Sequence, residues 1–415
     1  MPQKTRAQVQ TAIDGIKNLI TADGKIDAAE LDSVLTDIND SAHIKNSDTY
    51  PSGGGGTIST TDLAIVPWVV GRNKSLLAFG NSITQNDEYV RAMSDYFRSS
   101  SRTSWTNAGE STRGQIKRIN QEDRIPLNRT SIISWMNGIN DIRFNNSSTN
   151  YKFRHVDHVR EFLCNAFAAS ITTSASPSST TGTWTNWGNG LTYNGRTNAR
   201  YTTDLNGSMT FNFPAGVKSM FVAFFTNMPS DSEDYSSQVD VHCEGVFIES
   251  ININKKSTGF DHYTYHLPRT YFEASGGGGI TLTNKDSGKK MIIDYFGYLA
   301  DPKDTQPAIV WDNSYVANEL MVAGYSEGGN TVPSGINRAW WDECDGAVRQ
   351  MIIDNFTYYG YPVIMPRTNT FFEPNDFTYT PGGGLTNPNQ WDGLHPNLLG
   401  HKRIFSALRL ACIVN

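Results

Sequence analysis

The sequence predicts an α/β fold in which a mostly parallel sheet with covering helices is interrupted by an inserted all-β sandwich. Two observations support this prediction. Short apolar strand patterns alternate with helical patterns over residues 62–170 and again over residues 306–415, which is typical of a parallel sheet between helices. Over residues 171–305, short runs with a two-residue period are separated by turn signals, as in a β-sandwich. We therefore expect one α/β domain in two parts, with a second domain inserted between them.

In the first part of the α/β domain, three runs of residues are typical of strands. They cover Ser75–Phe79, Ser104–Asn107 and Ser131–Met136, and a helix is expected over Glu88–Phe97. The apolar face of a further helix is predicted by Phe153, Val156, Val159, Leu163 and Phe167. This alternation predicts parallel strands joined by crossover helices.

In the inserted domain, apolar and polar residues alternate. Phe211 and Phe213 form one apolar pair, and a longer run has Val239, Val241 and Cys243 separated by polar residues. Ile280 and Leu282 repeat the pattern. No long run of residues here has the apolar spacing of a helix, so we expect only strands in this domain.

The second part of the α/β domain is expected to add two helices and a strand. The first helical face is formed by Trp341, Cys344, Val348, Met351 and Ile352. A strand is predicted over Tyr361–Met365. The last helix is expected at about Asn397–Cys412, and its predicted buried residues are Ile404, Phe405 and Leu408.

Residues 1–50 are expected to form a helical module, joined to the rest by a glycine-rich linker, residues 51–61. Each of the two expected helices carries one apolar stripe, which a single helix cannot bury. The module is therefore expected to pack against a partner or another copy of the chain.

Composition excludes several classes of function. The chain has 415 residues and a net charge of -6 without a cluster of Lys and Arg, so no nucleic-acid partner is expected. No apolar run approaches the ~20 residues of a membrane helix, and the polar N-terminus has no signal-peptide core, so no membrane insertion is expected. The scattered cysteines are expected to be free and largely buried thiols. Neither a metal nor a cofactor is expected.

Two short segments far apart in the sequence carry the residue types of acyl-transfer chemistry. Gly80-Asn81-Ser82-Ile83 follows an expected strand, and Asp392-Gly393-Leu394-His395 precedes the last expected helix. A serine needs a base to take its proton, and an imidazole oriented by a carboxylate is such a base. We therefore predict Ser82, His395 and Asp392 as nucleophile, base and orienting acid. Taken singly, Ser82 and Asp392 would be helix caps, and His395 an ordinary polar group.

Two further positions are predicted to supply an oxyanion hole together with the backbone N–H of Ser82. Gly109, in Asn107-Ala108-Gly109, would bring a backbone N–H close to the developing charge, because it has no Cβ. Asn140, in Gly138-Ile139-Asn140-Asp141, would donate its side-chain amide. Each residue by itself is also common in ordinary turns.

These four segments, in this order, resemble the sequence blocks of the SGNH (GDSL-type) hydrolases. The resemblance covers roughly residues 62–170 and 306–415 and implies a three-layer, flavodoxin-like sheet and a serine esterase mechanism. The family's aspartate before the serine is Asn81 in this chain. Asparagine is nearly isosteric and can also accept a turn hydrogen bond, so we expect altered local electrostatics rather than lost catalysis.

The family includes lipases, thioesterases and carbohydrate deacetylases, so the resemblance leaves the substrate open. The inserted sandwich, with Trp184, Trp187 and Tyr193, favours a carbohydrate ester, most simply an O-acetyl group on a bacterial surface polysaccharide. These aromatic residues could stack on sugar rings, but core packing of the sandwich is their expected use. Residues 1–50 loosely resemble helical modules of phage tail proteins. This implies a virion tail location, binding to other tail proteins and a homo-oligomer, most simply a trimer. A cytoplasmic location is the alternative.

Two rival functions remain open from the sequence. The chain could be a non-catalytic receptor-binding protein that uses the sandwich as a lectin, or a lipid or thioester hydrolase in which the sandwich is only structural.

Overall fold

The computed structural model describes seventeen segments of the chain, all within a unit that spans Pro67–Asn415. They are residues 68–70, 74–85, 87–121, 131–144, 151–169, 175–187, 199–217, 219–226, 238–253, 261–267, 277–299, 306–316, 326–327, 330–331, 338–372, 376 and 395–414. The expected helical module, residues 1–50, and the linker, residues 51–61, lie outside this part of the chain.

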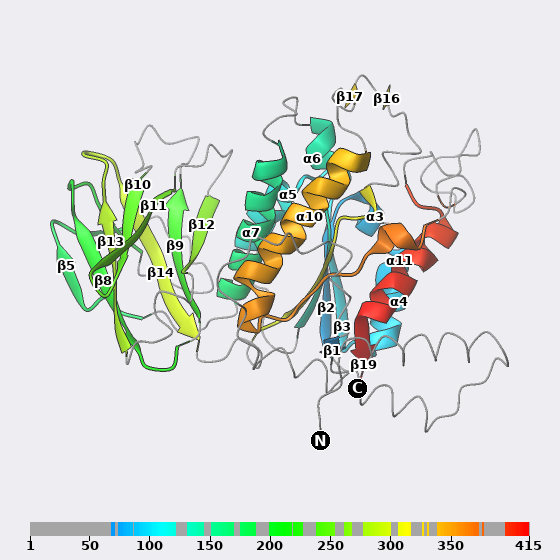
Figure 1. Cartoon of the computed structure of the whole chain (residues 1–415), viewed down its shortest axis with the longest axis horizontal. Helices are drawn as coiled ribbons and strands as arrows, with labels where there is room; N and C mark the ends of the chain where they lie inside the picture. Colours follow the sequence, from blue (N-terminus) through cyan, green and yellow to red (C-terminus); the bar gives the residue numbers. More distant parts are fainter. Residues whose placement is uncertain are drawn as a thin grey trace, which may run out of the picture. The chain divides into compact units, whose positions relative to one another are not determined.

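A five-stranded parallel sheet forms the centre of the α/β domain (Figure 1). Its spatial order is β18 (Val363–Ile364), β15 (Ala308–Asp312), β4 (Ser131–Met136), β2 (Ser75–Gly80) and β3 (Ser101–Thr106). Chain order therefore runs outward from β2 in both directions, as in flavodoxin-like sheets. The predicted parallel α/β sheet with an inserted β domain is confirmed. The strand order also creates a switch point between β2 and β4, where ligands of such sheets bind.

Helices cover both faces of this sheet (Figure 1). One layer contains α5 (Thr112–Gln121), α7 (Tyr151–Ala169) and α10 (Arg338–Asn355), and the other α4 (Glu88–Phe97) and α11 (Leu398–Ala411). The first layer packs on alternate residues of the central strands, since Phe79, Trp135 and Trp311 share one core with Phe162 of α7. Trp135 stacks on Phe162 with 3.7 Å between ring centroids. The remaining short elements are α3 (Ser82–Gln85), α6 (Ile139–Phe144), η2 (Thr357–Tyr359), η3 (Thr368–Thr370), β16 (Ser326–Glu327) and β17 (Asn330–Thr331).

The last helix differs in detail from its prediction. Asn397 is not helical but caps α11, because its side chain accepts a hydrogen bond from Gly400 N at 3.0 Å. Cys412 is already extended and starts β19 (Cys412–Val414), which pairs in parallel with β1 (Trp68–Val70). Phe405 is only half-buried and meets the edge of the Tyr96 ring, whereas Ile404 is buried as expected.

The inserted domain is a sandwich of two five-stranded antiparallel sheets. The first sheet has the order β11 (Val246–Asn252), β10 (Gln238–Cys243), β13 (Gly277–Asn284), β8 (Ser208–Pro214) and β5 (Ser179–Thr181). The second has β12 (Asp261–Leu267), β9 (Ser219–Thr226), β14 (Met291–Leu299), β7 (Arg200–Thr202) and β6 (Thr185–Asn186). The expected alternation is present, because Phe211 and Phe213 are buried in the sandwich core while Asn212 between them is exposed.

Strand β9 is buried on both faces and joins the sandwich to the α/β domain. Met220 and Val222 lie in the sandwich core, whereas Phe221 and Ala223 lie in the core shared with α7 and α10. A run of apolar residues without polar alternation is expected for such a strand. The sandwich is therefore held by a continuous apolar core.

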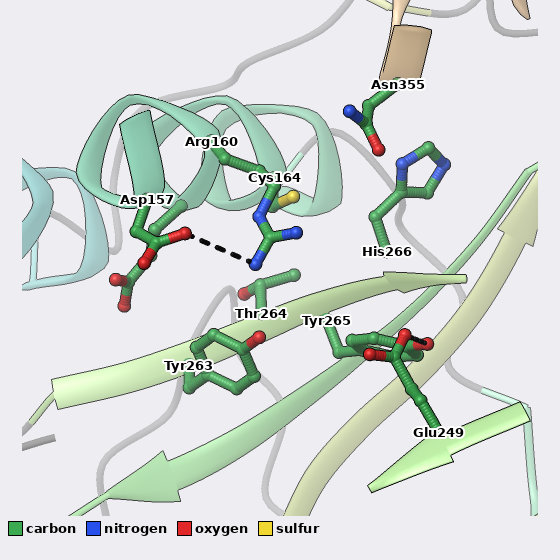
Figure 2. Close-up of a pocket in the computed structure, with 10 residues that line it drawn as sticks. Asp157, Arg160, Cys164, Glu249, Tyr263, Thr264, Tyr265, His266 and Asn355 are labelled. Atoms are coloured by element: carbon green, nitrogen blue, oxygen red, sulfur yellow. Dashed lines mark hydrogen bonds and ion pairs between the residues drawn. The ribbon is translucent and has the colours of Figure 1, made fainter. Parts of the chain in front are cut away.

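A polar cavity of about 40 Å³ lies along the same interface, between α7 and β12 (Figure 2). Arg160 extends from α7 toward β12 and lies 3.7 Å from Asp157, while the hydroxyl of Tyr265 donates to Glu249 (Figure 2). Thr264 of β12 also donates to Asn165 of α7. The hydrogen bond between Thr264 and Asn165 thus adds a polar contact between α7 and β12 to the apolar core at this junction.

The four cysteines are free and buried, as expected. Among the described helices, none has the length and apolar character needed to cross a membrane.

Candidate active site

The predicted site residues gather at one edge of the parallel sheet. Gly80, the last residue of β2, is in register with the last residues of β3 and β4. Ser82, Gly109 and Asn140 follow these three strand ends within a few residues. Because parallel strands end at the same edge, three segments separated in sequence meet at the switch point of the sheet.

Ser82 and His395 are hydrogen bonded to each other. His395 Nε2 lies 2.7 Å from Ser82 Oγ, although the two residues are 313 positions apart. Ser82 opens the short helix α3, and His395 precedes α11 with only 6% of its surface exposed. With a neutral imidazole whose Nε2 is unprotonated, the serine hydroxyl donates to the ring, which is the arrangement of an activated nucleophile.

Local hydrogen bonds fix the turn that presents Ser82. The side-chain oxygen of Asn81 accepts from Ile83 N at 3.0 Å and so forms a turn around the serine. Gly80 is required here, because a Cβ at this position would collide with Thr84 Oγ1. The Thr84 hydroxyl is in turn 2.9 Å from the hydroxyl of Tyr89.

The segment that carries His395 is anchored at Asn397. The Asn397 N–H donates to the carbonyl oxygen of Asp376 at 2.7 Å, and its side chain caps the first turn of α11. His401, one turn further along this helix, is buried and stacks on Tyr89. Burial, with a smaller contribution from the nearby His395, lowers the pKa of His401 to about 4, so this second imidazole is neutral at pH 7.

The turn that contains Gly109 is joined directly to Asn140 in the first turn of α6. Gly109 has φ 75°, a left-handed conformation, within a turn closed by Glu110 N and Asn107 O at 3.2 Å. The Asn140 side-chain amide donates to Glu110 O at 3.1 Å. Burial raises the pKa of the Glu110 carboxyl, although its partner Arg118, at 2.8 Å, opposes that shift.

A buried polar layer supports these segments, and two of its members, Thr112 and Asn137, are not identifiable from the sequence pattern. The Asp141 carboxylate accepts from Thr112 N at 3.0 Å and from Thr112 Oγ1 at 2.8 Å. Asn137 donates to the same hydroxyl at 3.1 Å. Burial raises the pKa of Asp141 to about 6, against the opposing effect of the Thr112 hydrogen bonds. Asp141 thereby holds the start of α5 against the start of α6.

The remaining predicted residues fall into two groups. Asp392 and Tyr193 lie outside the described residues, so their roles stay predictions. Trp184 is packed against the sandwich core, and Trp187 lies beside Tyr201 with the Lys290 ammonium 5.0 Å from its ring centre. Among the described residues, no group of three or more His, Cys, Asp or Glu side chains has the arrangement of a metal site.

The sandwich contains its own cavity of about 290 Å³. Apolar walls include Phe211 and Phe296, and the polar lining includes Asn186, Arg200 and Asp294. Arg200 pairs with Asn186 on β6, so the two side chains share one face of the sheet. The register of β14 shifts at Asp294, which marks a β-bulge, a feature that redirects a side chain.

Comparison with known proteins gives only distant similarity. No protein-family model matches this sequence, and a search of curated proteins finds no match either. Among solved structures, a family 35 carbohydrate-binding module from an environmental isolate is 15% identical over 34% of this chain and 96% of the module, with a TM-score of 0.24.

Two further solved structures are similar to different extents of the chain. A family 36 carbohydrate-binding module, determined with calcium and xylotriose, is 16% identical over 31% of this chain and 98% of the module, with a TM-score of 0.23. The porcine torovirus haemagglutinin-esterase is 10% identical over 82% of this chain and 87% of its own, with a TM-score of 0.32. Because these TM-scores are all below 0.5, the chemistry of this chain must be inferred from its own residues.

Proposed function

We propose that this protein is a serine esterase of the SGNH type, with Ser82 as nucleophile and His395 as general base. The observation that carries the proposal is the 2.7 Å contact between Ser82 Oγ and His395 Nε2 at the switch point of a parallel sheet. A serine cap of a helix needs no imidazole on its hydroxyl, so this contact favours the catalytic interpretation over an ordinary cap.

The reaction follows from this arrangement. Ser82 Oγ attacks the ester carbonyl carbon, and its proton passes to His395 Nε2. The resulting oxyanion accepts hydrogen bonds from the N–H groups of Ser82 and Gly109 and from the Asn140 amide, and the loss of one such donor typically costs ~3 kcal/mol of transition-state stabilisation. Collapse of this intermediate breaks the ester C–O bond, and His395 returns its proton to the departing alcohol. Water then attacks the acyl-enzyme by the same route and releases the acid.

Asp392 is proposed to orient the imidazole and to stabilise its protonated form. Its position three residues before His395 in the sequence is the support for this role.

As substrate we propose an ester, most simply an O-acetyl group, on a carbohydrate such as a bacterial surface polysaccharide. The cavity in the sandwich supports this class. Its lining combines the donor Arg200, the acceptor Asp294 and apolar walls, which suit the hydroxyls and the C–H faces of a sugar. The proposed location on a virion tail and the homo-oligomer rest on residues 1–50, which lie outside the described part of the chain.

The test is acetate release from O-acetylated bacterial surface polysaccharide by the native protein and by Ser82→Ala. The native protein is expected to release acetate, and Ser82→Ala to be slower by several orders of magnitude with a residual rate above that in water. Ser406→Ala serves as the control, because this hydroxyl only donates to Lys402 O on the exposed side of α11. Equal rates for the native protein and Ser82→Ala would remove Ser82 from the mechanism.

A second candidate function is carbohydrate binding without catalysis, with the α/β domain as scaffold. The cavity of about 290 Å³ in the sandwich is the observation that favours it. In this case neither the native protein nor Ser82→Ala would hydrolyse any ester, while both would bind the polysaccharide equally and Arg200→Ala would bind less.

A further inference from the structure

We propose that Tyr315 is a positioning residue for the Ser82 nucleophile, and that it acts in this way only with a hydrogen-bond donor at position 81. This inference deepens the proposed esterase function and rests on it. Tyr315 belongs to no segment that the sequence singles out. It follows β15, more than two hundred residues after Ser82.

Tyr315 and Asn81 are both fully buried and hydrogen bonded to each other. The Asn81 amide nitrogen donates to the Tyr315 hydroxyl at 3.1 Å. The same hydroxyl donates to the carbonyl oxygen of Asn137 at 3.0 Å. One phenol group thus joins the residue before Ser82 to Asn137, in the short connection between β4 and α6.

The direction of these hydrogen bonds is determined by the groups at both ends. A backbone carbonyl only accepts, so the single proton of Tyr315 must point to Asn137 O. The tyrosine oxygen must then accept a proton from position 81. At the other end, Ile83 N only donates, so the oxygen of the Asn81 amide faces it and the nitrogen faces Tyr315. Each of these three hydrogen bonds therefore has one possible direction.

An ionised aspartate at position 81 would break this order. Its carboxylate has no proton to donate, so it would compete with Asn137 O for the one proton of Tyr315. The protonated acid could still donate, but only while a buried carboxyl keeps its proton. The asparagine in this chain is thus matched to Tyr315, and the departure from the Gly-Asp-Ser pattern of the SGNH hydrolases has a local physical cause.

The network explains how Tyr315 would affect catalysis without touching the substrate. Asn137 is also held through its side chain, which accepts from Trp311 Nε1 at 3.2 Å and donates to Thr112. Tyr315 therefore connects the Ser82 turn to a rigid layer on β4 and β15. A small displacement of the nucleophile relative to the oxyanion donors is enough to slow the reaction strongly.

The first experiment compares Tyr315→Phe with the native protein in the hydrolysis of 4-nitrophenyl acetate. We expect kcat to fall roughly 10-fold to 100-fold, with KM changed less than about twofold, because the serine is misplaced while the binding surface stays. The rate of covalent labelling of Ser82 by a fluorophosphonate is expected to fall in parallel. Near-UV circular dichroism at the assay temperature checks that the variant is folded.

The matched control is Tyr361→Phe. Tyr361 is equally buried and its hydroxyl also bonds to one side chain, Ser219, but it lies before β18, at the opposite end of the strands from Ser82. Its loss is expected to leave kcat within about twofold of the native value. A folded Tyr315→Phe variant with a native kcat and native labelling rate would overturn the inference.

The second experiment tests the direction of the hydrogen bonds with Asn81→Asp, which keeps the acceptor for Ile83 and replaces only the donor. The measured quantity is the ratio of its kcat to the native kcat, taken at each pH. We expect this ratio to be below one and to decrease as pH rises and the introduced carboxyl ionises. A ratio of one at every pH would refute the requirement for a donor.

The two levels of the proposal fail in different ways. A native protein that neither hydrolyses esters nor labels at Ser82 would overturn the esterase function and this inference with it. An active native protein whose Tyr315→Phe variant is unimpaired would overturn the positioning role alone.

Discussion

Replacement of Gly138 by alanine is expected to destabilise the protein by about 2–5 kcal/mol and to impair the site. Gly138 has φ 113°, and a backbone of this kind costs an L-residue about 1–2 kcal/mol. A Cβ there would also lie 2.8 Å from Trp341 Cη2. Trp341 is fully buried and its indole N–H donates to Asn313 O at 3.1 Å, so it cannot simply move aside. Such overpacking typically costs about 1–3 kcal/mol more.

The measurement is urea unfolding of Gly138→Ala beside Gly216→Ala. Gly216 has φ 79°, and a Cβ added there would have no atom within 4 Å, so its variant carries the backbone cost alone. The difference between the two variants isolates the clash with Trp341 and is expected to be about 1–3 kcal/mol. Because Asn140 lies two residues further along, Gly138→Ala should also lower kcat, while Gly216→Ala should not. Equal destabilisation by the two changes would refute the role assigned to Trp341.

Three further predictions concern buried charge. Burial lowers the pKa of His155 from 6.5 to about 3, so the folded state favours the neutral imidazole. The stability that this neutral imidazole contributes is complete above pH 6.5. As pH falls to about 3, the free energy of unfolding is expected to decrease by up to about 5 kcal/mol. Urea unfolding at a series of pH values should show this decrease for the native protein and not for His155→Gln. The pKa of Asp141 is raised instead, from 3.8 to about 6, so the stability it contributes is complete below pH 3.8 and falls by about 3 kcal/mol as pH rises to 6; Asp141→Asn should abolish this dependence. Arg349→Met removes the buried cation that pairs with both Asp312 and Asp345, and chemical denaturation should show a loss of about 3–5 kcal/mol in the free energy of unfolding; a loss below about 1 kcal/mol would contradict the pairing.

The fold could be predicted from the sequence wherever apolar residues recur with a strand or helix period and are buried in the structure. Every residue of β4 is buried, as its apolar run predicts, and the predicted bounds of this strand match those in the structure. The apolar stripe of α10, from Trp341 to Ile352, is buried as predicted. Backbone geometry sets the strand and helix periods, so these periods can be recognised in the sequence without knowledge of the tertiary structure.

The candidate site could be predicted only in part. Ser82 and His395 were identifiable because each has a distinctive local sequence, and the structure brings them together. Tyr315, Asn137 and Thr112 carry no such signal. Each is an ordinary polar or aromatic residue whose importance comes from its partner, and that partner is set by the tertiary fold rather than by spacing in the chain.

The sandwich and the α/β domain share a buried apolar cluster. Phe221 and Ala223 of β9 lie in the same buried cluster as Phe162 of α7 and Trp135 of β4. Trp135 lies in β4, whose carboxyl end leads toward α6 and Asn140, and its indole N–H donates to Gln115 of α5 at 2.6 Å. Because interiors are close-packed and transmit strain, a shift of the sandwich would be felt by α7 and β4 before it reached the loops of the site. The inserted domain therefore shares the buried core against which α7 and β4 pack, and this packing does not depend on whether the sandwich binds a sugar.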